Sequence, residues 1–122
     1  MEIKALADLF SVCKVEAVTQ IDLSKDFCFV AKTDEELSLV CPTKDVPGVT
    51  SARDDGWRGF RIQGTLDFSL IGILAKISAI LAEQRIGIFA ISTYNTDYIL
   101  LKQAHYPRAL SALANAGYTI EE

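Results

Sequence analysis

Residues 67–72 and 92–97 hold the side chains best suited to ligand chemistry in this chain. Asp67, Ser69 and Gly72 stand at the expected start of a helix. The first N–H groups of a helix lack partners within it and carry partial positive charge, so a carboxylate or another small anion binds favourably there. Serine at such a position most often caps the helix. A purely structural role is therefore favoured when this segment is taken alone.

The second segment offers the opposite polarity. Asp97 can accept hydrogen bonds from an ammonium group, and Thr93 and Asn95 supply neutral donors and acceptors. Asn and Asp also hydrogen-bond their own backbone, so ordinary turn chemistry is favoured for this segment alone. Together, a helix start for a carboxylate and an aspartate for an ammonium group match the two charges of an amino acid. Three or four charge-assisted hydrogen bonds of roughly 1.5–3 kcal/mol each would support a micromolar ligand, about −8 kcal/mol.

The surrounding pattern predicts the elements that position these two segments. A half-covered strand is expected over Trp57–Leu66, and a helix from about Leu70 to Gln84, with apolar residues at i, i+3 and i+4. Gly87 is well placed to stop that helix in a left-handed turn. Strands at Ile88–Thr93 and Tyr98–Lys102 then form a hairpin around the polar tip.

A second helix and a last strand complete this half. Tyr106 and Pro107 open the helix, Gly117 ends it, and Tyr118–Glu122 is expected to be a strand. The order β-α-β-β-α-β predicts an α+β, ferredoxin-like architecture, in which both helices cover one face of an antiparallel four-stranded sheet.

The first half of the chain is rich in predicted strands. Leu9–Val15 alternates in polarity, and Glu2–Leu6 is expected to pair with it. Phe27–Lys32 and Leu37–Cys41 are expected to form a hairpin, and Gly48–Gly56 is the best linker candidate. We expect this half to pack on the open face of the sheet, with a second copy of the chain as the alternative occupant.

Composition narrows the classes of function. Half of the 122 residues are apolar, which indicates a compact globular protein. The net charge is −4 and basic residues occur singly, so nucleic acid is not expected as a partner. The apolar windows are too short and too interrupted to cross a membrane, and no secretory signal is visible, so we expect a cytoplasmic protein.

The cysteines and the histidine indicate no metal site, no cofactor and no catalytic residue. Cys13, Cys28 and Cys41 are widely spaced, and His105 is the one histidine, so no zinc-ligand spacing is present. We expect the three thiols to be small hydrophobes on buried strand positions of a reduced protein. Nothing in the sequence requires a nucleophile–base pair, and no phosphate-binding or dinucleotide loop is present.

The β-α-β-β-α-β order, with DFSLIGIL at its first strand–helix junction, resembles an ACT domain, the small regulatory module that binds amino acids. The run LDFSLIGILAKISAILAEQRIGIFAISTYNTDYILL resembles the ACT subfamily that includes cytosolic arginine-sensing proteins. The segments TDEELSLVCP (Thr33–Pro42) and GWRGFRIQG (Gly56–Gly64) fit that subfamily too. The resemblance implies a tandem, with a degenerate ACT-like half over residues 1–56 and an ACT domain over residues 57–122.

In that family the ligand sits where two ACT units meet, against the loop that opens the first helix and the end of the second strand. The resemblance implies a carboxylate end at Ser69, Leu70, Ile71 and Gly72, and an amino end or polar side chain at Thr93, Asn95 and Asp97. The usual loop has a glycine just after its aspartate, where this chain has Phe68 and Ser69. Arginine specificity is not implied, because the arginine sensors carry two full ACT pairs per chain.

We therefore expect non-catalytic binding of a small amino acid or related metabolite by a regulatory sensor module. Its output would pass through a protein partner or a change of oligomeric state, and a homo-oligomer such as a dimer is expected. One alternative is a structural dimerisation module without a ligand. A less favoured alternative is a ferredoxin-like hydrolase such as a small phosphatase, which would need an arginine or lysine in its phosphate loop, and Asp67–Gly72 contains neither.

Overall fold

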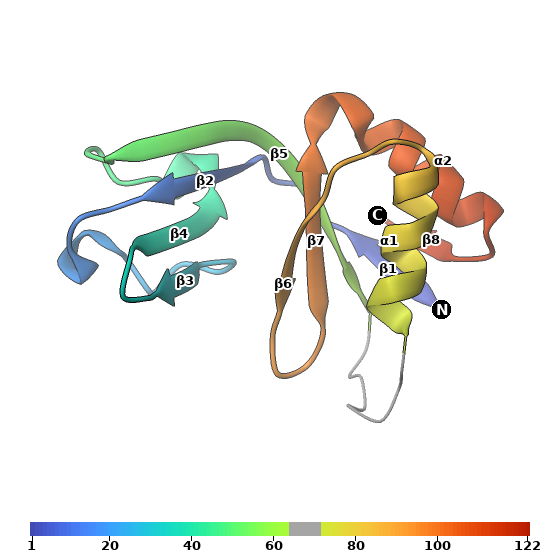
Figure 1. Cartoon of the computed structure of the whole chain (residues 1–122), viewed down its shortest axis with the longest axis horizontal. Helices are drawn as coiled ribbons and strands as arrows, with labels where there is room; N and C mark the ends of the chain where they lie inside the picture. Colours follow the sequence, from blue (N-terminus) through green and yellow to red (C-terminus); the bar gives the residue numbers. More distant parts are fainter. Residues whose placement is uncertain (64–71) are drawn as a thin grey trace. The chain divides into compact units, whose positions relative to one another are not determined.

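The structure, a computed structural model, describes residues 1–63 and 72–122 (Figure 1). The sequence predictions for Ser69, Leu70 and Ile71 lie outside the described residues. The strands are β1 (Glu2–Ala5), β2 (Phe10–Lys14), β3 (Phe29–Lys32), β4 (Leu37–Pro42), β5 (Ala52–Ile62), β6 (Phe89–Ser92), β7 (Asp97–Lys102) and β8 (Thr119–Glu121). The helices are α1 (Ile73–Glu83) and α2 (Tyr106–Asn115), with 3₁₀ turns η1 (Val18–Gln20), η2 (Thr43–Asp45) and η3 (Gln103–His105).

The chain forms two compact units. The larger unit contains Met1–Ala7 and Arg58–Glu122, and the smaller unit contains Asp8–Trp57. The expected boundary after residue 56 falls beside the point where β5 passes from one unit to the other, but Met1–Ala7 joins the larger unit. The division into a degenerate ACT-like half over 1–56 and an ACT domain over 57–122 stays a prediction.

The larger unit is built on a sheet with the strand order β6-β7-β5-β1-β8. Strand β1 runs antiparallel to β5, with Ile3 opposite Ile62, and parallel to β8, with Ile3 opposite Ile120. The expectation that Glu2–Leu6 pairs with Leu9–Val15 is therefore wrong. Alternating polarity identifies a strand but not its partner, and Ile3 is fully buried here because β1 enters the sheet between β5 and β8.

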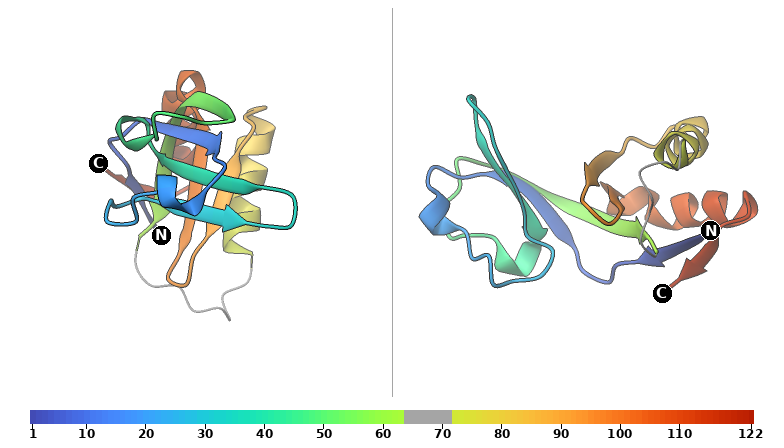
Figure 2. Two further views of the ribbon diagram at one scale, coloured as in Figure 1. Left: turned by 90° about the vertical axis from the view of Figure 1, so that its left-hand side faces the viewer. Right: turned by 90° about the horizontal axis from the view of Figure 1, so that it is seen from below.

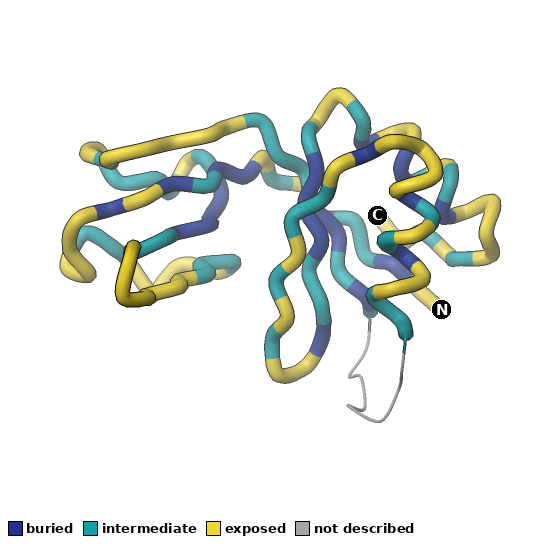
Figure 3. Tube along the Cα trace, viewed as in Figure 1, coloured by how far each residue is buried: buried dark blue, intermediate teal, exposed yellow. Residues whose placement is uncertain are grey.

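The core of the larger unit lies between the helices and one face of this sheet. Phe60 and Ile62 of β5 are fully buried, whereas Arg61 between them is partly exposed, as the predicted alternation requires. Both helices lie on the same side of the sheet, as Figures 2 and 3 show. The predicted β-α-β-β-α-β order and the α+β fold class are confirmed for β5 to β8, with β1 as an additional strand. The buried cluster is Ile3, Phe60, Ile62, Ile77, Leu81, Ile86, Ile99, Leu101, Tyr106, Ala109 and Leu113.

Both helices end in the same hydrogen-bonded motif. After α1, the Arg85 N–H donates to the Ala82 carbonyl (2.9 Å) and the Ile86 N–H donates to the Leu81 carbonyl (3.0 Å). This is the Schellman pattern, and its left-handed residue is Arg85, with a φ of 58°. The expectation that Gly87 supplies the left-handed turn is wrong. The chain turns two residues earlier, at Arg85, because this places the side chain of the next residue, Ile86, in the buried core.

In α2 the expected glycine does occupy the left-handed position. Gly117 has a φ of 103° and its N–H donates to the Ala114 carbonyl (3.1 Å). The N–H of Tyr118 donates to the Leu113 carbonyl (3.1 Å), which completes the same motif.

The smaller unit holds four strands in the order β3-β4-β2-β5. The predicted hairpin is confirmed, since β3 and β4 pair antiparallel with Phe29 opposite Val40. The linker expected over Gly48–Gly56 is wrong from Ala52 onward, where β5 begins. This part of β5 pairs with β2 at one side of the unit. Its side chains are polar and exposed, as is typical of a loop, but they belong to a strand at the side of the sheet.

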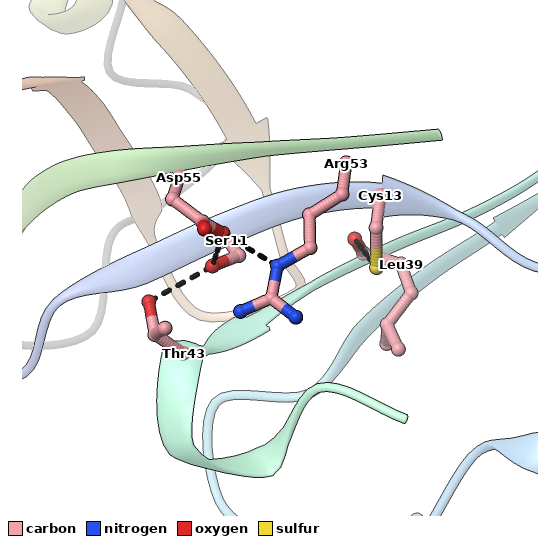
Figure 4. A network of polar contacts seen from close by, with 6 residues as sticks. All are labelled: Ser11, Cys13, Leu39, Thr43, Arg53 and Asp55. Atoms are coloured by element: carbon pink, nitrogen blue, oxygen red, sulfur yellow. Dashed lines mark hydrogen bonds and ion pairs between the residues drawn. The ribbon is translucent and has the colours of Figure 1, made fainter. Parts of the chain in front are cut away.

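A bulge in β5 places a polar network on β2 (Figure 4). Asp55 and Gly56 together face Ser11. Gly56 has a φ of 87°, a backbone conformation that residues other than glycine rarely adopt. The Ser11 hydroxyl is fully buried; it donates to Asp55 and shares a hydrogen bond of 2.8 Å with the Thr43 hydroxyl. Arg53 pairs with the same Asp55 carboxylate (2.8 Å). These contacts fix the register of β2 against β5.

The hairpins of the two units repeat element by element. Strands β3 and β4 and turn η2 have counterparts in β6, β7 and η3, each numbered 60 positions higher. In both tips a threonine N–H donates to the carbonyl three residues later at 2.9 Å, from Thr33 to Glu36 and from Thr93 to Thr96. In both, the threonine hydroxyl accepts a backbone N–H in return (3.1 and 3.3 Å). Between β2 and β3, however, the smaller unit has η1 where the larger unit has α1.

The helix ends predict opposite effects for two substitutions. Arg85→Gly should raise the free energy of unfolding by about 0.5–1 kcal/mol, because removing the left-handed strain outweighs the entropy of glycine. Gly117→Ala should lower it by about 1–2 kcal/mol. Urea denaturation measures both, and Gly87→Ala is the control, since an added Cβ there meets nothing and its φ is not left-handed. Stabilisation by Gly87→Ala is compatible with this account, whereas a loss of 1 kcal/mol or more would contradict it.

Candidate functional site

The described part of the site consists of the end of β5, the tip of the β6–β7 hairpin and the start of α1. The Thr96 hydroxyl donates a hydrogen bond of 2.7 Å to the carbonyl of Ile62, the last residue of β5. Thr96 is only 7% exposed, so this bond is shielded from water. It fixes the hairpin tip to the end of the strand. Sequence analysis did not select Thr96, and a threonine between two more polar residues carries no signal of this role.

Thr93 shapes the hairpin tip. Its hydroxyl donates to the Thr96 carbonyl (2.8 Å) and accepts the Thr96 N–H (3.3 Å). This is the turn chemistry that the sequence favours when the segment is taken alone. Asn95 is exposed, and Asp97 is partly exposed at the start of β7, opposite Ser92. The three hairpin residues selected from the sequence therefore share one tip, where Thr93 holds the turn and Asn95 and Asp97 remain accessible.

A glycine occupies the N-cap position of α1. Gly72 is the N-cap residue, with a φ of 84°, and no side chain hydrogen-bonds to the first turn from that position. The helix begins at Ile73, and the prediction that Ser69 caps it lies outside the described residues. Gly72 has no side chain to hydrogen-bond the first N–H groups of α1, and the partial positive charge of such groups attracts an anion.

The hairpin tip and the start of α1 lie at the same end of the larger unit, as Figures 1 and 2 show. The structure thus brings Gly72 to the same end as Thr93, Asn95 and Asp97. Ser69, Leu70 and Ile71 lie outside the described residues.

The thiols are poorly suited to catalysis. Cys13 and Cys41 are buried and Cys28 is half-buried. Burial raises the pKa of Cys41 to about 12 and also raises the pKa of Cys13 and Cys28, so all three are protonated near neutral pH. Within residues 1–63 and 72–122, no group of three His, Cys, Asp or Glu side chains is arranged to hold a metal ion. None of the described helices is long and apolar enough to span a membrane.

Comparisons with known proteins place this geometry in a family. The ACT domain model matches residues 52–115, which is more than half of the chain. The crystal structure of protein Atu0741 from Agobacterium tumefaciens is 30% identical with a TM-score of 0.84, over 98% of this chain and 90% of that one. The chain belongs to the ACT domain family.

More distant structures share the fold. A Vibrio cholerae protein, VC0802, described as of unknown function and a possible transport protein, is 21% identical with a TM-score of 0.72, over 92% of this chain and 86% of that one. Aspartate kinase from Clostridium acetobutylicum is 14% identical with a TM-score of 0.67, over 93% of this chain but 33% of that one. A search of curated proteins found no match.

Membership of the ACT family supports a regulatory, amino-acid-binding module in general. The narrower resemblance to the arginine-sensing subfamily is not confirmed by these comparisons, and they identify neither a ligand nor a partner.

The bond between the hairpin tip and β5 predicts a specific loss of stability. Thr96→Val keeps the shape of the side chain but removes the donor, so the free energy of unfolding should fall by about 1–2 kcal/mol. Thr96→Ser keeps the donor, so it should lower the free energy of unfolding by less than half as much. Chemical denaturation of the two variants compares them directly, and a larger loss in Thr96→Ser than in Thr96→Val would show that the methyl group contributes more than the hydroxyl.

The raised pKa of Cys41 predicts a pH dependence. The thiol has a pKa of about 12 in the folded chain and a reference value of 9.0, so above pH 9 the unfolded chain loses this proton first. The neutral thiol therefore favours folding fully below pH 9, and this contribution falls by up to about 1.4 kcal/mol per pH unit above it. Denaturation at pH 8 to 11 should give a shallower decline for Cys41→Ala than for the wild type. Parallel declines would refute this assignment.

Proposed function

We propose that this protein binds a small amino acid or related metabolite, without transforming it, at the end of the larger unit where the hairpin tip and the start of α1 lie. The observation that carries this proposal is the buried bond from Thr96 to Ile62, which holds a tip carrying Asp97 at the same end of the larger unit as the start of α1. Membership of the ACT family supports the same class of ligand.

The two charges of the ligand are assigned to opposite ends of the site. Its carboxylate binds at the segment that opens α1, and the residues proposed for it are Ser69, Leu70, Ile71 and Gly72. Gly72 lacks a side chain, so a ligand can approach the backbone there without meeting a Cβ. The ammonium group, or a polar side chain of the ligand, binds at Asp97 and Asn95, while Thr93 holds the turn that presents them.

The smaller unit is proposed to be a degenerate ACT-like half. The repeat of hairpin and 3₁₀ turn at a spacing of 60 residues supports this proposal, as does the matching threonine turn in each tip. The ligand signal is proposed to pass to a protein partner or to a change in homo-oligomeric state.

Calorimetry of the wild-type chain against the twenty amino acids at millimolar concentration tests the proposal. At least one should bind, and Asp97→Ala should weaken that binding tenfold or more, because a charge-assisted hydrogen bond of roughly 1.5–3 kcal/mol is lost. The unliganded melting temperature should change little, since Asp97 is partly exposed at the end of a strand.

Glu35→Ala is the matched control for that experiment. Glu35 is an exposed acid in the corresponding tip of the smaller unit, so its removal lowers the net negative charge equally without touching the site. Equal loss of binding in the two variants would point to net charge as the cause. If no amino acid binds, or if Asp97→Ala loses fold stability instead of affinity, the hairpin is a structural turn. If an amino acid does bind, size-exclusion chromatography with and without it distinguishes a sensor, whose oligomeric state changes, from a dimerisation module, whose oligomeric state stays fixed.

A further inference from the structure

A cavity of about 500 Å³ lies on the larger unit beside α1. Its walls come from one side of α1, from the segment that follows α2 and from Met1. None of the residues proposed for the amino-acid site lines its described part. The volume falls within the range of roughly 300–1,000 Å³ that is usual for small-molecule sites. The side chains that decide its chemistry are Ile73, Lys76, Ala79, Ile80 and Tyr118.

The walls of the cavity are mainly apolar. Ile73 and Ile80 lie two turns apart on α1 and are only half-buried, so each presents apolar surface to the cavity. Ala79 is exposed beside them and leaves room that a larger side chain would fill. Tyr118, in the segment that follows α2, also lines the cavity and carries an aromatic side chain. A ligand here gains chiefly by removing an apolar body from water.

Lys76 is the single charged side chain among the described residues that line the cavity, and no carboxylate lines it there. The ion pairs of the described chain do not include Lys76. The ammonium group of a free amino acid would therefore find no carboxylate partner. A ligand with one negative charge and an apolar body matches both the walls and the charge.

We infer that this cavity is a second small-molecule site, which binds monocarboxylates with an apolar body and no ammonium group. The apolar body lies between α1 and Tyr118, and the carboxylate pairs with the Lys76 ammonium group. The inference does not rest on the proposed amino-acid site, because the two share no residue in the described part of the chain.

Octanoate is the probe, measured by calorimetry with the full chain. It should bind with a dissociation constant below 1 mM, and octylammonium, which has the same chain length and the opposite charge, should bind at least tenfold more weakly. Lys76→Met keeps an unbranched side chain and removes the charge, so it should weaken octanoate several-fold while reducing the difference between the two probes.

A matched pair of substitutions on α1 locates the binding. Ala79→Phe fills the cavity and should weaken octanoate tenfold or more. Ala82→Phe adds the same ring at an exposed position of α1 outside the lining and should leave the affinity within twofold. Far-ultraviolet circular dichroism confirms that both variants fold.

Three outcomes would overturn the inference: no octanoate binding at 10 mM, equal binding by the two phenylalanine variants, or equal affinity for octanoate and octylammonium. Failure of the amino-acid screen leaves this result unaffected, since octanoate carries no ammonium group for Asp97. Conversely, loss of octanoate binding in Ala79→Phe would not affect the amino-acid titration.

Discussion

The hydrogen bonding of β5 is the constraint on which both units depend. Its first part pairs with β2 in the smaller unit, and its last part pairs with β1 in the larger unit. Phe60 and Ile62 of β5 are fully buried and pack in the core between α1, α2 and one face of the sheet. At its end the carbonyl of Ile62 accepts the Thr96 hydroxyl, so the same strand that builds the core also positions the hairpin tip. Core packing and site geometry are consequently not independent.

A comparison of the repeated elements explains why the proposed site lies in the larger unit and has no counterpart in the smaller unit. Both hairpin tips form the same threonine turn, through Thr33 and Thr93. In the smaller unit, however, the three-residue turn η1 stands where α1 stands in the larger unit. Three residues cannot sum their peptide dipoles or present a row of free N–H groups as an eleven-residue helix does. The smaller unit therefore has the hairpin but lacks a long helix in the place where we propose that the larger unit binds the carboxylate.

Periodicity in the sequence was enough to predict the strands, both helices and the α+β class, because burial imposes a period of two or 3.6 on each element. It did not predict the partner of β1, since pairing is set by register across the sheet. It placed a linker over the polar start of β5, where one-sided pairing leaves polar side chains exposed on a strand. At the site, Asp97 could be selected from the sequence because its side chain is charged. Thr96, which fixes the hairpin tip, is recognisable only from its burial and its hydrogen bond to the Ile62 carbonyl.

If the proposal is correct, the start of α1 and the hairpin tip bind one amino acid together. Amide NMR of ¹⁵N-labelled protein during titration with the best-binding amino acid tests it most directly. We expect the resonances of Gly72, Asn95 and Asp97 to shift along a single saturation curve with one dissociation constant. Shifts at the hairpin tip without any at Gly72, or two curves with different constants, would contradict it.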